Sequence, residues 1–204
     1  MSKVKITGDA SGTGVFTIAA PDSDETRTLT LPDAAGTLLT SDGDGSSLTS
    51  VGKVLQVVSA TKTDTFYTAT SDSWVDITGL SAAITPASTS SKVLIMYNVM
   101  GEEDSESYGL ALNMVRGTTT INVGDAASSR TQASTATDSY AWGSLTWGSH
   151  VSTYLDSPST TSATTYKIQG YGSSGFYVNR NNTDNDHADH QRLTSSITLM
   201  EIGA

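Results

Sequence analysis

The stretch of sequence best suited to bind a ligand is the polar run "NRNNTDNDHADH" (179–190). Asn, Asp and His side chains can form hydrogen bonds with sugar hydroxyls, and Tyr171, Phe176 or Tyr177 nearby can stack on a sugar ring. Because loops carry binding residues more often than cores do, we predict an exposed loop that contacts a glycan or protein receptor. The alternative is a solvated connection between strands. The candidate contact residues are Tyr171, Tyr177, Arg180, Asn182, Asp184, Asp186 and His187.

The histidines of the same run could hold a metal ion. His187 and His190 stand among three aspartates, and imidazole with carboxylate suits a divalent transition ion. The H-x-x-H spacing, however, sends the two rings to opposite faces of a strand, so a shared ion would require a loop. A second acidic run, "DGDGSS" (42–47), lacks the Glu of an EF-hand, since Lys53 occupies that position. We predict no metal ion and no other cofactor.

Acidic residues are also concentrated in "GEEDSE" (101–106). Two carboxylates at a defined separation can hydrolyse a glycosidic bond, so a polysaccharide depolymerase is one alternative. Acids that are adjacent in one loop generally repel each other into water instead. His150 has no visible nucleophile partner, and no G-x-S-x-G elbow is present. We therefore predict no catalytic residue and expect that the protein is not an enzyme.

Charge and composition restrict the classes of partner. The 204 residues carry 11 basic and 21 acidic side chains, a net charge of −10, so we predict no nucleic-acid partner, which would need a basic face. The absence of cysteine excludes disulfides and thiolate sites. No apolar run approaches the length of a membrane span, and "MSKVKITGDASG" lacks the apolar core of a signal peptide. We expect that the protein does not insert into a membrane. We also expect that it is synthesised in a cytoplasm.

The elements that would position these residues are strands. The chain contains 30 Ser, 32 Thr and 18 Gly, which favour strands and turns, and it has no amphipathic helical stripe. We predict an all-β fold in which residues 53–204 form an antiparallel, jelly-roll-like β-sandwich head. The segment "KVLIMYNVM" (92–100) is apolar on both faces, so it should be a central strand covered on both sides, with a neighbouring subunit as one candidate cover. The other expected strands are 53–59, 65–69, 73–78, 108–117, 118–124, 141–155, 164–172, 175–180 and 195–202.

The N-terminal segment poses a problem of burial. Residues 1–41 consist of short alternating pieces, and a Gly/Ser-rich hinge (42–52) separates them from the head. A segment of this size has too few large side chains to offset its ordering entropy alone. Copies packed around a threefold axis would bury each leucine, worth roughly 1.5–3 kcal/mol per side chain. We predict a β shaft whose axis is lined by Leu29, Leu31 and Leu38; the alternative is a sticky linker.

Several segments of the sequence resemble segments of a known class of proteins. "ITGDASGTGVFTIAAP" and "RTLTLPDAAGTLLT" resemble the N-terminal segment of fibre proteins of tailed bacteriophages, especially marine ones. "WVDITGLSAAITPASTSSKVLIMYNVMG", "YLDSPSTTSATTYKIQGYG" and "SSITLMEIGA" resemble a phage fibre head. Together these blocks cover most of the chain. The resemblance implies a homotrimer that docks on another virion protein through residues 1–41, with a head similar to the trimeric jelly rolls of the C1q and tumour-necrosis-factor type.

The expected function follows from that resemblance. It implies a structural virion fibre, assembled in the host cytoplasm and exposed on the mature particle. Its head would be presented to a host cell-surface glycan or protein during adsorption, and three weak sites on one trimer would gain from avidity. A capsid-attached head fibre or decoration protein would have the same architecture, so this alternative stays open.

Overall fold

The computed structural model describes residues 11, 13, 53–104, 109–137 and 148–203. The described residues from Lys53 onward belong to one compact unit. Leu29, Leu31 and Leu38, predicted to line a threefold axis, and the predicted hinge (42–52) lie outside the described residues. Those predictions therefore stay predictions.

One antiparallel sheet, here called the first sheet, has four strand positions. Strands β1, β11, β4 and β8 lie side by side in that order, while β2 and β10 continue the positions of β1 and β11 toward the far end of β4. Gly101 of β4 pairs with β8 on one side and β10 on the other, so β10 and β11 share one side of β4. The strands are β1 (Val54–Lys62), β2 (Phe66–Thr68), β4 (Lys92–Glu103), β8 (Gly148–Asp156), β10 (Phe176–Val178) and β11 (Ser195–Ile202).

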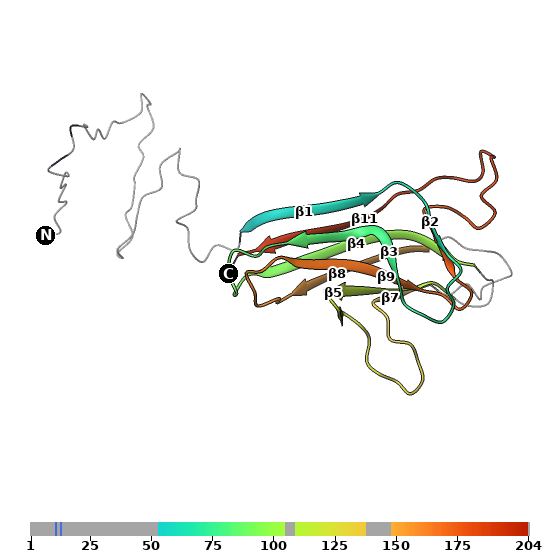
Figure 1. The fold of residues 1–204 in the computed structure, drawn as a ribbon, viewed down its shortest axis with the longest axis horizontal. Coiled ribbons are helices and arrows are strands. Elements are labelled where there is room, and N and C mark those ends of the chain that lie inside the picture. Colours follow the sequence, from blue (N-terminus) through green and yellow to red (C-terminus); the bar gives the residue numbers. More distant parts are fainter. Residues whose placement is uncertain (1–10, 12, 14–52, 105–108, 138–147, 204) are drawn as a thin grey trace, which may run out of the picture. The chain divides into compact units, whose positions relative to one another are not determined.

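The second sheet is also antiparallel and lies against the first (Figure 1). Strands β3, β9 and β5 are adjacent, and both β6 and β7 pair with β5 on its remaining side. Alternate residues of its strands face the first sheet and are buried. The strands are β3 (Val75–Ile84), β5 (Ala111–Arg116), β6 (Thr119–Ile121), β7 (Thr135–Ala136) and β9 (Thr164–Tyr171).

The order of the strands is that of a jelly roll. The chain crosses from the first sheet to the second and back after β2, β3 and β4, stays in the second sheet through β5, β6 and β7, and then alternates again through β8, β9 and β10. Such an arrangement of two four-stranded antiparallel layers is the jelly-roll solution to packing sheets face to face. The prediction of an all-β antiparallel sandwich is confirmed.

The core lies between the two sheets, and β4, the longest of the described strands, contributes alternate residues to it. Val93, Ile95, Tyr97 and Val99 alternate along β4, point inward and are almost fully buried. They pack against inward-facing side chains of β3, β5, β9, β10 and β11. Burial of each such side chain contributes roughly 1.5–3 kcal/mol, and with no cysteine in the sequence no disulfide adds to this.

The unit has two distinct ends, which lie about 36 Å apart along β4 at roughly 3.3 Å per residue. At one end the backbone N–H of Gly203 donates to the carbonyl of Lys53 at 2.9 Å, so the two ends of the unit's chain meet there. The opposite end, which we call the distal end, carries the β2–β3, β9–β10 and β10–β11 connections (Figure 1). The backbone N–H of Asp72 bonds to the carbonyl of Gly172 at 3.0 Å and joins two of these connections.

Candidate functional site

The polar run at 179–190 lies in the loop between β10 and β11, two strands that occupy the same position beside β4. The chain leaves the first sheet at Asn179, after β10, and returns at Ser195, where β11 begins. Asn179 is buried and has a φ of 61°, a left-handed conformation that Asn tolerates better than most residues. Its amide nitrogen donates to the carbonyls of Lys62 (2.9 Å) and Asp64 (3.0 Å), and its Oδ1 accepts from Ser195 Oγ (2.6 Å). These bonds fasten the base of the loop.

Two tyrosines from neighbouring strands stack beside this loop. Tyr67 of β2 and Tyr177 of β10 are register partners, and their ring centroids are 4.6 Å apart at an interplanar angle of 16°. Both hydroxyls donate to Asp104, Tyr177 to Oδ1 at 2.8 Å and Tyr67 to Oδ2 at 3.1 Å. Burial, reinforced by the hydrogen bond to Asp104 and its charge, raises the pKa of Tyr177. Tyr67 is 46% exposed and Tyr177 only 7%, so Tyr67 offers the accessible ring.

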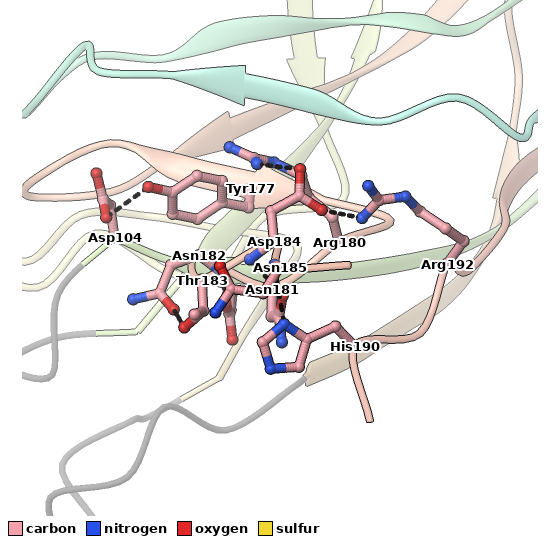
Figure 2. Close-up of polar contacts among 11 residues, drawn as sticks. Asp104, Tyr177, Arg180, Asn181, Asn182, Thr183, Asp184, Asn185, His190 and Arg192 are labelled. Carbon is pink, nitrogen blue, oxygen red and sulfur yellow. Dashed lines mark hydrogen bonds and ion pairs between the residues drawn. The ribbon is translucent and has the colours of Figure 1, made fainter. Parts of the chain in front are cut away.

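Arginine side chains join the loop to the tyrosines. The Cζ of Arg180 lies 4.5 Å from the ring centroid of Tyr177, within cation–π distance. Arg180 Nη1 also donates to Asp184 Oδ2 at 2.6 Å, and Arg192 donates to the other carboxylate oxygen of Asp184 (Figure 2). The bond from Arg192 and then that from Arg180 lower the pKa of Asp184. We call Tyr67, Asp104, Tyr177, Arg180, Asp184 and Arg192 the distal cluster.

A buried carboxylate lies beneath the loop. Glu102 projects from β4 on the same face as Tyr177, its register partner, and its Oε1 accepts the backbone N–H of Asn182 at 2.6 Å. Its Oε2 is buried and has no hydrogen-bond partner among the described residues. Burial, the largest influence, raises the pKa of Glu102, Asp104 adds to this, and the Asn182 bond and Arg180 oppose it.

Two acids of the run 101–106 do not project into water as expected, while residues 105 and 106 lie outside the described residues. Glu102 and Glu103 are both buried, because β4 continues as far as Glu103 instead of ending at residue 100. Successive strand residues face opposite ways. Glu102 therefore lies on the outer face of the first sheet with Tyr177, and Glu103 follows the inward direction of its register partner Phe176. The two carboxylates do not share a cleft.

The two histidines of the run lie in a turn. The backbone N–H of His190 donates to the carbonyl of His187 at 3.0 Å, and the ring centroids are 6.2 Å apart. Nδ1 of His190 accepts the N–H of Asn185 at 3.0 Å (Figure 2), and Nδ1 of His187 accepts that of Asp189 at 3.3 Å. Each ring thus uses one nitrogen locally. In the described ranges, no group of three or more His, Cys, Asp or Glu side chains is arranged to hold a metal ion.

The structure brings together only part of the predicted contact set. Tyr177, Arg180, Asn182 and Asp184 meet at the base of the loop, whereas Asp186 and His187 lie at its exposed outer part. Tyr171 belongs to the second sheet, where its ring lies 5.3 Å from that of Trp74. Sequence reasoning missed four residues that complete these arrangements: Tyr67, Trp74, Asp104 and Arg192.

Removal of the carboxylate between the two arginines should loosen the loop. We expect Asp184→Ala to raise amide hydrogen exchange across residues 181–192 severalfold, because both arginines lose their shared acceptor. The lowered pKa of Asp184 means that these contacts persist above the ordinary pKa of Asp and are lost as the pH falls through the depressed value. Asp186→Ala, at an exposed position of the same loop, is the control. Equal exchange in both variants would contradict the assignment.

The fold and this end of it define a class: an all-β jelly-roll domain with a polar, aromatic cluster at its distal end. No protein-family model matches the sequence, and no curated protein is detectably similar to it. Within the described part of the chain, no helix has the length and apolar character required to cross a membrane.

Proposed function

We propose that the protein is a structural virion fibre of a tailed bacteriophage, a homotrimer whose head is presented to a host cell-surface glycan or protein during adsorption. The resemblance of the N-terminal and head segments of the sequence to fibre proteins of tailed bacteriophages supports this proposal. The head supports it too, because it is an antiparallel jelly roll with a polar, aromatic cluster at its distal end, a suitable surface for contact with a receptor.

The observation that carries the proposal is an apolar row on the outer face of the first sheet. The register places Leu155, Leu94, Met200 and Val57 side by side across four strands. Val57 is 55% exposed and Leu155 47%. Val54, also exposed, pairs with Ile202 next to this row. Apolar side chains that adjoin one another on a surface commonly mark a contact with another chain.

A second copy of the chain is the cover that this face fits best. None of the four side chains in the row is charged, so copies can meet there despite a net charge of −10 per chain. Outward-facing Thr153, Met96, Thr198 and Ser59 form the register row on one side and are also uncharged, whereas the row on the other side contains the exposed Lys92, the partner of Ile202. Apolar contact along the face would supply the cohesion that disulfides provide in other small assemblies.

Light scattering of the full chain tests the assembly. We expect a mass near three times the 21.2 kDa of one chain, and we expect Val57→Asp with Leu155→Asp to yield folded monomers, because each copy would bury two carboxylates. Thr165→Asp, at an exposed position of β9, is the matched control and should stay trimeric. A monomeric wild-type chain would refute the homotrimer. A trimer that survives the double substitution but is lost on Leu29→Asp with Leu31→Asp would move the assembly contacts to residues 1–41.

A separate experiment is needed to find whether the protein is attached to the tail or to the capsid of the particle. Antibodies against residues 53–203 should label the tail of the virus that encodes this chain when particles are viewed by electron microscopy. Labelling of the capsid instead would favour a head fibre or decoration protein. Sugar release from host polysaccharide would favour a depolymerase, for which Glu102 and Glu103 are poorly placed because they face opposite sides of β4.

A further inference from the structure

The distal end carries a second arrangement, on the second sheet, that the distal cluster does not include. An open hollow of about 560 Å³ lies beside the C-terminal end of β9, among the neighbouring connections. Its lining combines an aromatic ring, hydroxyl groups and one carboxylate. The lining residues are Asp72, Gly109, Thr131, Tyr171, Ser173 and Ser174.

The aromatic wall of this hollow is held in place from behind. The Tyr171 hydroxyl donates to Asp72 Oδ1 at 3.0 Å, and the Trp74 ring lies 5.3 Å from the Tyr171 ring at an angle of 47°. Asp72 is itself fixed, because its backbone N–H donates to the carbonyl of Gly172. A ring whose orientation is set before binding loses little conformational entropy when a ligand stacks on it.

A hydroxyl on the hollow's wall is fixed in the same way. Both the backbone N–H and the Oγ of Ser173 donate to Glu103 Oε1, each at 2.5 Å. Glu103 is buried, and its Oε2 has no hydrogen-bond partner among the described residues. The Ser173 hydroxyl therefore has its proton committed to Glu103, which leaves its oxygen lone pairs available as acceptors for a ligand hydroxyl.

The chemistry of the lining matches a polyhydroxylated, uncharged ligand. An aromatic face can stack on the C–H groups of a sugar ring, and Asp72, Thr131 and the serines can exchange hydrogen bonds with its hydroxyls. The lining contains one carboxylate, with Glu103 close behind it, and no Lys, Arg or His. An anionic sugar would meet negative charge without a compensating cation.

We propose that this hollow is a binding site for a neutral oligosaccharide, with Tyr171 as the stacking platform and Asp72 and Ser173 as hydrogen-bonding groups. The inference rests on the proposed function and specifies which chemical class of receptor the head takes. It places recognition on the second sheet, beside the β9–β10 connection, rather than on the loop between β10 and β11.

A glycan array probed with the full chain tests the site. The array carries neutral hexose and hexosamine oligosaccharides together with uronate-containing and sialylated ones, and titration calorimetry follows on the best neutral ligand. We expect neutral ligands to be preferred, Tyr171→Ala and Asp72→Ala to weaken binding by about tenfold or more, and Tyr171→Phe to keep most of it. Ser174→Tyr, at an exposed position, should block the hollow without touching the core. Thr165→Ala, on an exposed part of β9, is the unaffected control.

The outcomes separate this site from the function on which it rests. Binding that is lost in Tyr67→Ala but kept in Tyr171→Ala and Ser174→Tyr would move recognition to the distal cluster and overturn the hollow. A preference for acidic glycans would overturn the neutral assignment. A chain that binds no glycan on the array, yet is trimeric and adheres to host cells, would refute the inference and leave the fibre intact. A monomeric chain that adheres to no cell would refute both the proposed fibre function and the inference that rests on it.

Discussion

Asp156→Ala is expected to lower the free energy of unfolding by about 3 kcal/mol. Asp156 is buried at the end of β8 in the first sheet, and its carboxylate accepts two bonds from Arg116 Nη1, at 2.9 and 2.8 Å. The hydroxyl of the fully buried Tyr166 donates to it at 2.6 Å. Arg116 and Tyr166 belong to β5 and β9, so this carboxylate bonds the two sheets together.

The size of the effect follows from what the substitution leaves behind. Alanine strands the Tyr166 hydroxyl in the core without an acceptor, and it leaves Arg116 with no carboxylate partner at this position. Because the Arg116 side chain is 30% exposed, water can partly replace its lost partner, which holds the expected loss at the lower end of the range for buried ion pairs. Tyr166→Phe should cost less, about 1 kcal/mol, since the Arg116–Asp156 pair remains.

Urea unfolding of the full chain at fixed protein concentration measures this, as a shift in midpoint with an unchanged slope. Asp76→Ala is the matched control. Asp76 pairs with Lys167 at 2.6 Å on the outer face of the second sheet and is largely exposed, so its loss should cost less than about 1 kcal/mol. If the two aspartates prove equally dispensable, Asp156 does not join the sheets in the way described.

Apolar alternation was enough to predict most of the strands. The expected strand 92–100 begins with β4 and ends before it, and 164–172 extends one residue past the end of β9. The expected strand 195–202 has the same bounds as β11. Strand β3 extends beyond residue 78, where the expected strand 73–78 ends. It continues to Ile84, since Gly79 has a φ of 90° and takes up an irregularity in the pairing between Asp76 and Ser81. The two-residue β7 has no pattern to detect.

The candidate site was harder to predict because it depends on pairings between distant segments. Tyr67 and Tyr177 are 110 positions apart and meet only through the register of β2 with β10. Tyr171 and Tyr177 are close in sequence, but the chain crosses between sheets after β9, which separates them. The unbroken apolar run at 92–100 indicated that this strand is apolar on both faces, and the apolar row on the outer face of β4 is the structural counterpart of that pattern.

Acid is expected to destabilise the head well above the pH at which carboxylates protonate, through His150. This ring is buried on β8 opposite Val99, a core residue, and its Nδ1 has no partner among the described residues. Burial lowers the pKa of His150 from 6.5 to about 4. Between these values the unfolded chain binds a proton at this residue and the folded chain does not. The stabilisation is therefore complete above about pH 6.5 and is lost progressively as the pH falls toward 4, by about 3 kcal/mol.

Replacement of the ring separates this contribution from those of the carboxylates. Burial alone would raise the pKa of Glu201, yet hydrogen bonds from Gln56 Nε2 and the Ala87 N–H outweigh it and hold that pKa below the ordinary value, so its stabilisation is lost only at lower pH. The raised pKa of Glu102 acts with the opposite sign, because its protonation as the pH falls favours the folded state. Urea midpoints measured from pH 7 to 4 should fall steeply for the wild-type chain and much less for His150→Leu, with His150→Gln as a second variant if leucine packs poorly. His187→Gln, which alters an exposed ring, should retain the wild-type slope. A His150→Leu chain that loses stability as steeply as wild type over this range would mean that the buried imidazole is not the group responsible.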